Sequence, residues 1–347
     1  MSALHPLPSS ALPDGIPLAP APWNTNAEFY IFLARTIPRP TSSDGESFNP
    51  NNEPSILQGL PAGSYHSLEE IHPSALQPVP VPGSDGHMQH RGSWPQIVIV
   101  RYKDSPVGSY DELMYMAGRF ENPVEGTGVE SGRITNIYVS SSAGALNGRR
   151  NWSTFILTLY ALIETRELSS ASDTPKHVAR FEWIPKPGDP NTTTLRVYHD
   201  RDAPLPLSAD EPFFVATLTR SRLPAIPVNT ARLPFASAIG RALRYVQPPL
   251  LRGRYPSDSK GVGAVIKTDD ALHGRTSPWL SFLPEYNGWF GVAYIEPVKG
   301  EEAFKDLGDG QGFPRCKPIW IGQRFEGMIH LPASEVVGEA GDSDRGK

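Results

Sequence analysis

Prolines are spread along the whole chain, and they limit the folds that the chain can adopt. Proline and glycine contribute 37 and 31 of the 347 residues, about a fifth of the chain, whereas about 12% is usual. Proline breaks helix interiors and is excluded from central strands. We therefore expect short strands joined by long connections. A helical bundle, a coiled coil or a solenoid of helix pairs is disfavoured.

The order of apolar segments predicts a single β-rich domain with perhaps two helices, over residues 23–335. Residues 1–22 are expected to form a flexible tail, residues 37–95 a long meandering connection, and residues 336–347 a disordered tail. Strands alternate too little with helical patterns for a parallel βαβ sheet. The best helical periodicity covers 233–245. The predicted strands cover residues 28–34, 96–102, 110–120, 133–140, 176–184, 194–199, 212–220, 263–267, 289–296, 318–325 and 327–331.

Charge and cysteine content exclude several classes of function. The net charge is −5, whereas binding that neutralises phosphates needs a basic surface, so we expect no nucleic-acid partner. Cys316 is the only cysteine, which rules out an intrachain disulfide and a cysteine zinc site. The start of the chain lacks the features of a secretory signal. The apolar run 155–163 is too short to span a membrane, for which about 20 residues are needed. We predict a soluble, cytoplasmic protein.

Known cofactor and metal motifs are missing from the sequence. It contains no phosphate-binding glycine loop, no His-Glu-x-x-His and no Gly-x-Ser-x-Gly. His87 and His90 lie close together, but in a Gly/Ser/Asp-rich segment. We therefore expect neither a cofactor nor a metal. Three polar clusters remain as candidates for chemistry, at residues 108–115 (GSYDELMY), 147–152 (NGRRNW) and 175–183 (PKHVARFEW).

In this order, the three clusters resemble the acetoacetate decarboxylase superfamily, and most closely its fungal members. The resemblance extends loosely from Pro22 to about Leu331 and is specific only around 107–120, 133–152 and 175–183. It implies a closed, cone-shaped antiparallel β-barrel with a few peripheral helices and long proline-rich loops. It also implies that Lys176, after Pro175, forms a Schiff base with a β-keto acid.

Further roles follow from the same resemblance. Glu112, in Gly108-Ser-Tyr-Asp-Glu112, would line the cavity and move protons. A second basic residue normally follows the nucleophile as lysine, but here it is His177, which as a mostly neutral group could shuttle protons. We also assign substrate contacts to Tyr110, Arg149, Trp152 and Arg180; Arg35 and Arg149 are the candidates for binding a substrate carboxylate. The family often forms homo-oligomers, so one is possible here.

The chemistry makes a demand on the site that does not depend on the family. A lysine attacks a ketone only as the neutral amine, and a free lysine, with a pKa of about 10.4, is almost fully charged at pH 7. Desolvation lowers such a pKa by up to about 3–5 units. Acetoacetate decarboxylase itself is a standard example of a lysine activated in this way. Strand alternation creates a tension, because Lys176 and Arg180 share one face while His177, Ala179 and Phe181 share the other, more apolar face. A barrel therefore needs a lined cavity on the Lys176 side, or a twist at Pro175.

About twenty residues, 154–173, separate the second cluster from the third, which follow each other closely in relatives. Either this segment is a gene-model artefact such as a translated intron, which we favour, or it is a lineage insertion that forms a short helix.

Three functions stay open. The first is a Schiff-base lyase acting on a small β-keto acid or related carbonyl compound, the second an aldolase or dehydratase using the same lysine, and the third a barrel that binds an apolar small molecule without catalysis.

Overall fold

The computed structural model describes residues 16–37, 60–67, 71–151, 176–201, 208–233, 244–249, 278–298 and 306–339. The predictions of a helix over most of 233–245, a strand at 263–267 and an insertion at 154–173 fall outside these residues, as does the apolar run 155–163. In the described part, no helix is long and apolar enough to cross a membrane.

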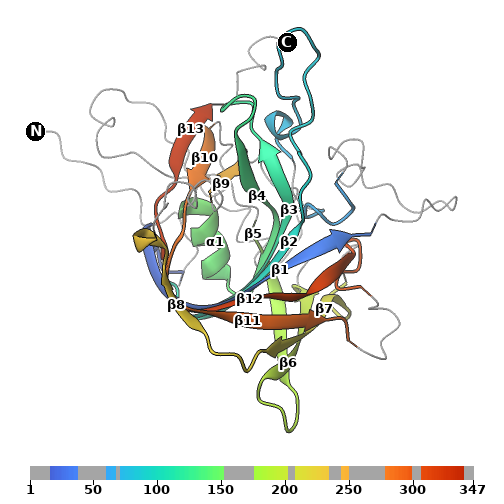
Figure 1. Ribbon diagram of the computed structural model, residues 1–347, viewed down its shortest axis with the longest axis vertical. Coiled ribbons are helices and arrows are strands. Elements are labelled where there is room, and N and C mark those ends of the chain that lie inside the picture. Colours follow the sequence, from blue (N-terminus) through green and yellow to red (C-terminus); the bar gives the residue numbers. More distant parts are fainter. Residues whose placement is uncertain are drawn as a thin grey trace, which may run out of the picture.

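One large sheet forms the molecule (Figure 1). Its strands follow in the order β13-β10-β9-β4-β3-β2-β1-β12-β11-β7-β6-β5, and β5 also pairs with β4. The run from β4 to β5 therefore closes into a ring, which confirms the predicted β-rich barrel. The strands are β1 (Trp23–Thr36), β2 (Gln96–Asp104), β3 (Tyr110–Glu121), β4 (Glu130–Val139), β5 (Lys176–Pro185), β6 (Thr192–His199), β7 (Pro212–Arg220), β8 (Ile226–Asn229), β9 (Tyr245–Gln247), β10 (Pro278–Phe282), β11 (Glu285–Glu296), β12 (Cys316–Leu331) and β13 (Glu335–Glu339).

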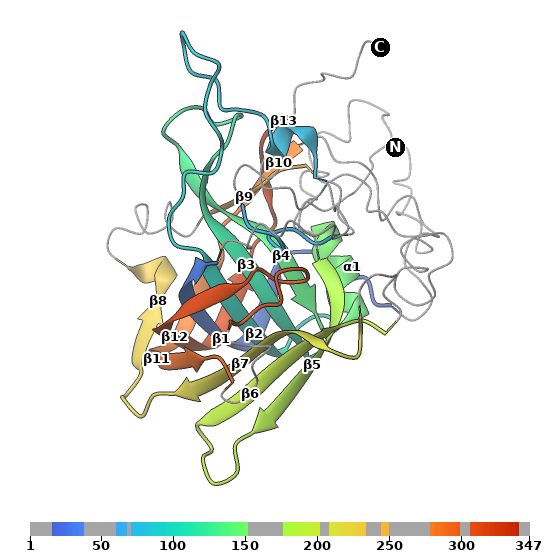
Figure 2. The same ribbon diagram turned by 90° about the vertical axis from the view of Figure 1, so that its right-hand side faces the viewer.

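Alternation along the strands builds two apolar cores, one on each side of the sheet. In β2, Ile97 and Ile99 join a first core with Leu113 and Tyr138, while Val98 and Val100 join a second core with Phe29 and Ile137. Successive side chains of a strand point to opposite faces, and both faces are buried here. β2 therefore reads as a continuous β-branched run. Figure 2 shows β5, β6 and β7 extending together away from the rest of the sheet.

The sheet is antiparallel except at two places, which the sequence did not predict. β4 runs parallel to β5 from Ile137 opposite Lys176, and it touches β9 in parallel at Gly132 opposite Tyr245. Helix α1 (Ser142–Asn151) follows β4 and lies in the hollow of the curved sheet against β4 and β5 (Figure 1). A parallel neighbour requires such a crossover, because a tight turn can only reverse the strand direction.

Several predicted boundaries differ from the structure. Residues 336–339, placed in the disordered tail, belong to β13 and pair with β10. Residues 17–19, placed in the flexible N-terminal tail, are tied to α1: Asn147 accepts from the Ala19 amide at 2.8 Å and donates to the Pro17 carbonyl at 2.8 Å. The segment 37–95 contains a short 3₁₀ helix, η3 (Pro73–Ala75), and Tyr245 lies in β9 rather than at a helix end. In each case, distant partners supply order that the local sequence does not encode.

Candidate functional site

Lys176 and Glu112 form a buried ion pair. Lys176 Nζ lies 2.7 Å from Glu112 Oε2, and the two residues are 4% and 2% exposed. β4 positions both of them, since Val139 pairs with Glu112 on one side and Ile137 with Lys176 on the other. The two side chains leave β3 and β5, which flank β4, on the side of the sheet that carries the second core. The structure thus brings together two of the residues that the sequence singled out.

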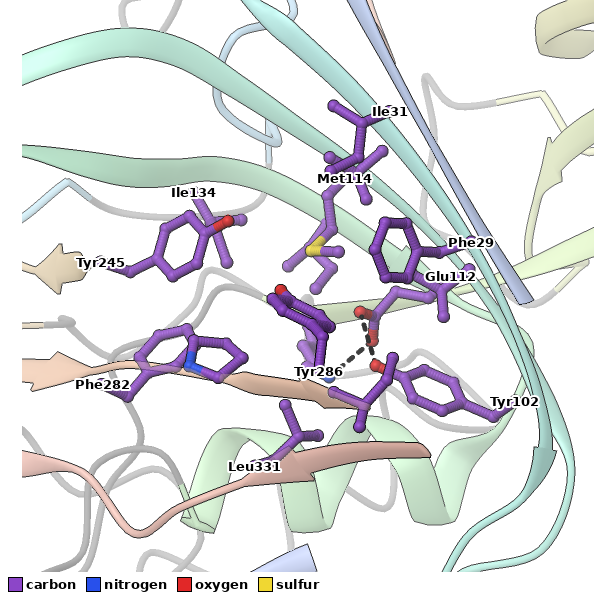
Figure 3. A pocket seen from close by; sticks show the side chains of 16 residues that line it. Phe29, Ile31, Tyr102, Glu112, Met114, Ile134, Tyr245, Phe282, Tyr286 and Leu331 are labelled. Carbon is purple, nitrogen blue, oxygen red and sulfur yellow. Dashed lines mark hydrogen bonds and ion pairs between the residues drawn. The ribbon is translucent and has the colours of Figure 1, made fainter. Parts of the chain in front are cut away.

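The pair borders a small apolar chamber of about 70 Å³. Figure 3 shows Glu112 and Tyr102 facing each other across this space, with Phe29, Met114 and Tyr286 around them. Glu112 and Lys176 are the only charged residues among the described residues that line it. The other lining residues are Phe29, Ile31, Val98, Val100, Tyr102, Met114, Ile134, Ile137, Tyr245, Phe282, Pro284, Tyr286, Ile329 and Leu331.

The tyrosines of the chamber are neutral near pH 7. Burial raises the pKa of Tyr245 to about 12. Burial, and then the nearby Glu112 carboxylate, raise the pKa of Tyr102 well above its usual range, and burial does the same for the pKa of Tyr286. Tyr102 donates a long hydrogen bond, 3.5 Å, to Glu112 Oε1. The chamber therefore places the Lys176–Glu112 ion pair beside tyrosines that stay uncharged.

Ion pairing and burial act on the Lys176–Glu112 pair in opposite directions. A carboxylate at 2.7 Å stabilises the ammonium, whereas removal from water destabilises both charges. Transfer of one proton from Nζ to the carboxylate converts the ion pair into a neutral amine beside a neutral acid.

Helix α1 shapes the site through three consecutive residues, Asn147, Gly148 and Arg149. Asn147 fixes the chain at residues 17–19 to the helix. Gly148 lies against the lysine stem, so that a Cβ at this position would stand 2.5 Å from Cδ and 2.7 Å from Cε of Lys176. Arg149 is buried and its Nη1 donates to the Lys176 carbonyl at 3.1 Å. Residues 147–152, the second cluster of the sequence, therefore contact both the side-chain stem and the backbone carbonyl of Lys176 through Gly148 and Arg149.

His177 does not share the chamber with Lys176. Its ring stacks on His66 with centroids 3.4 Å apart and an interplanar angle of 9°, on the side of the sheet that carries the first core. Adjacent strand residues point to opposite faces, so a residue directly after the lysine is directed away from its cavity. His177 was predicted as a catalytic residue that could shuttle protons, and the structure places it on the opposite face of β5 from the chamber. Both faces of β5 are covered at this end, which resolves the tension raised by strand alternation.

We call His66, His177 and His199 the histidine cluster. Burial, and then His177, lower the pKa of His199 to about 4. Burial, then His177, His199 and Arg149, lower the pKa of His66 well below its usual range. Packing is tight here, since a Cβ on Gly312 would lie 2.7 Å from the His199 ring. Within the described ranges, no three metal-ligating side chains form a possible ion site.

The other predicted substrate contacts have different surroundings. Tyr110 is buried beside the chamber, and its ring stacks on that of Tyr102 at 4.4 Å. Arg149 reaches the backbone of Lys176 rather than the chamber. Arg180 is exposed and lies over the Tyr198 ring at 3.8 Å, and Arg35 is exposed and lies over Trp94 at 4.9 Å. Trp152 is outside the described residues.

The sequence prediction missed most of the chamber wall. Phe29, Met114 and Tyr286 come from β1, β3 and β11. Phe29 and Tyr286 belong to none of the three clusters, and Met114 lies in the first cluster but was not singled out. The strand alternation that places Glu112 also places Met114 two residues on, so part of the wall was available from periodicity. Tyr245 and Phe282 could not be predicted from periodicity. They lie in β9 and β10, short strands that continue the sheet beyond β4 and outside the ring.

Comparison with known proteins returned only distant structural likenesses. No family model matches the chain, and no curated protein sequence matches it. An acetoacetate decarboxylase from Legionella pneumophila shares 13% identity with a TM-score of 0.47, covering 98% of this chain and 99% of its own. The enduracididine biosynthesis enzyme MppR complexed with pyruvate gives 12% and 0.44, covering 94% of each chain. An acetoacetate decarboxylase-like enzyme from Sphingomonas wittichii gives 11% and 0.42, with coverages of 98% and 100%. At these values the likeness carries no argument about the function of this chain.

Proposed function

We propose that the protein is a Schiff-base lyase that acts on a small β-keto acid or related carbonyl compound through Lys176. The observation that carries this proposal is the Lys176–Glu112 pair, 2.7 Å apart and almost fully buried, on the wall of an apolar chamber. A structural ion pair has no need of a cavity beside it. A reactive amine needs both the cavity and a nearby acceptor for its proton.

Glu112 moves the protons of the reaction. It accepts a proton from the Lys176 ammonium, and the free amine attacks the ketone carbon. Protonation of the carbinolamine oxygen then releases water and leaves a protonated imine. The electron pair of the bond to the carboxylate flows into this imine as CO2 departs, which gives an enamine. Protonation of the enamine carbon and hydrolysis of the imine release the ketone and restore the amine.

The apolar wall favours the bond-breaking step. A carboxylate that enters the chamber loses water, and its conversion to neutral CO2 removes a charge from that environment. Arg149 acts in this scheme as a positioning residue, because it holds the Lys176 carbonyl and not the substrate.

A second candidate function follows from the composition of the same wall. Apart from Lys176, the described lining residues include no cation that could bind a substrate carboxylate. This favours a neutral ketone or aldehyde, and hence aldol cleavage or dehydration through the same imine. Location in the cytoplasm and membership of the fungal branch of the family stay predictions.

The proposal is tested by CO2 release from 3-oxobutanoate. We expect release above the spontaneous rate, lost in Lys176→Met and kept in Lys186→Met, whose lysine is exposed. Cleavage of a 4-hydroxy-2-ketone without CO2 release would replace the decarboxylase with the aldolase. Thermal stabilisation by ketones with neither reaction would overturn the enzyme proposal and leave a binding protein.

A further inference from the structure

A larger apolar groove lies next to the chamber. Its volume is about 650 Å³, compared with about 70 Å³ for the chamber. Leu223 and Ile226, each 63% exposed, stand on its wall with Val228 and Phe290. Exposed large apolar side chains that gather around a hollow are typical of ligand sites.

The two cavities share four side chains. Phe29, Ile31, Tyr245 and Tyr286 line both of them. Figure 3 shows Tyr286 and Tyr245 on the chamber side, across from Ile31 and Met114. The rings and aliphatic side chains of these residues make the boundary between the cavities mostly apolar, and its polar atoms are the hydroxyls of Tyr245 and Tyr286.

The difference in size matters for any substrate. A chamber of about 70 Å³ has room for only a few heavy atoms beyond the reacting carbonyl, since one water occupies about 30 Å³ of the liquid. Lys176 is 4% exposed, so a substrate must reach it through an opening bordered by other residues. The groove borders the chamber at the four shared side chains and reaches exposed residues such as Leu223 and Ile226.

We propose that the substrate carries an extended apolar group that runs from the carbonyl at Lys176, past Tyr245 and Tyr286, into the groove beside Ile226. This inference rests on the proposed function and adds a substrate class to it, a long-chain or aryl carbonyl compound. The four side chains that the groove shares with the chamber favour this occupant over a protein partner, because a partner has no need of a groove that borders the chamber of Lys176.

The test measures non-covalent binding, so that its outcome is separate from turnover. Dissociation constants are measured for methyl ketones from 2-butanone to 2-dodecanone on Lys176→Met, which forms no imine. We expect affinity to rise about fourfold for each methylene that becomes buried. Ile226→Glu should weaken the long ketones at least tenfold and leave 2-butanone unchanged. Met88→Glu, at a residue 56% exposed and outside both cavities, is the matched control.

The outcomes distinguish failure of the substrate class from failure of the lyase proposal. The substrate class is overturned if affinity does not depend on the chain length of the ketone, or if Ile226→Glu leaves the affinity for long ketones intact. Either result is expected if another segment of the chain or a second copy of the protein covers the groove. Length-dependent affinity without any lysine chemistry in the unmodified protein sustains the groove and overturns the lyase.

Discussion

Lys176 and His177 are neighbours in the chain, but their surroundings have little in common. Lys176 faces the apolar chamber and forms an ion pair with Glu112. His177 stacks on His66 in a closely packed cluster, and none of the cavities described above is lined by it. Both residues are 4% exposed. Equal burial thus accompanies different surroundings, because of the two residues only Lys176 lines a cavity described above.

The largest effect on catalysis should be the difference between two single substitutions, one at Lys176 and one at His177. Lys176→Met removes the nucleophile, so kcat/KM should fall at least about 10³-fold. His177→Gln keeps the chamber intact and should stay within about tenfold of the unmodified protein. Steady-state kinetics gives kcat/KM of each variant relative to the unmodified protein, and circular dichroism checks that both variants fold. Equal losses of kcat/KM in two folded variants would contradict the distinction between the two faces of β5.

Glu112→Gln should lower both turnover and stability. Loss of the proton carrier should reduce kcat about 10²- to 10⁴-fold, and a buried ammonium without its partner should cost about 3–5 kcal/mol of unfolding free energy. The double variant Glu112→Gln/Lys176→Met should recover most of that stability, because no buried charge is left. Urea unfolding of the single and double variants tests this. A stable single variant would mean that water reaches the pair.

Gly148→Ala should move the lysine without unfolding the helix. The new Cβ would stand 2.5 Å from Lys176 Cδ, and a displacement of about 1 Å at a reacting group reduces rates about 10²-fold. Gly144→Ala on the same helix, whose Cβ would meet Tyr110 only at 3.3 Å, is the control. We expect a fall in kcat for Gly148→Ala alone. Similar kinetics for both variants would show that contact with the helix does not position the lysine.

A smaller effect is expected in the acid response of the histidine cluster. The folded pKa of His199, about 4, lies below the unfolded value of about 6.5. The unfolded chain therefore binds more protons between these values, and stability falls as the pH drops from about 6.5 to 4. From pH 7 to pH 5 this residue accounts for about 2 kcal/mol. His199→Gln should reduce the loss of unfolding free energy between those pH values by about that amount. An unchanged pH difference would mean that the ring is protonated in the folded protein.

The sequence predicted the barrel strands well because their signal is local. β2 is a β-branched run bounded by Pro95 and a polar turn, and its position follows from composition alone. α1 was missed because Ser142–Asn151 combines two glycines with consecutive arginines and has no apolar stripe. That helix is held by its contacts with residues 17–19 and Lys176, which lie far away in the chain.

The site residues likewise divide into those that a local motif predicts and those that depend on distant parts of the chain. Lys176 and Glu112 were identified from short motifs, and the chain brings them together across β4. His177 and Arg180 were grouped with the lysine because they adjoin it in sequence, although alternation and exposure separate them. Whether a strand face lines a cavity or a packed core depends on residues from β9, β10 and β11, which no motif near the lysine reveals.

Reductive trapping tests the central claim most directly. Incubation with acetone and borohydride should add a single isopropyl group to the unmodified protein and to His177→Gln, and peptide mapping should place it on Lys176. Lys176→Met should remain unlabelled. Label spread over exposed lysines, with Lys176 unmodified, would contradict the account.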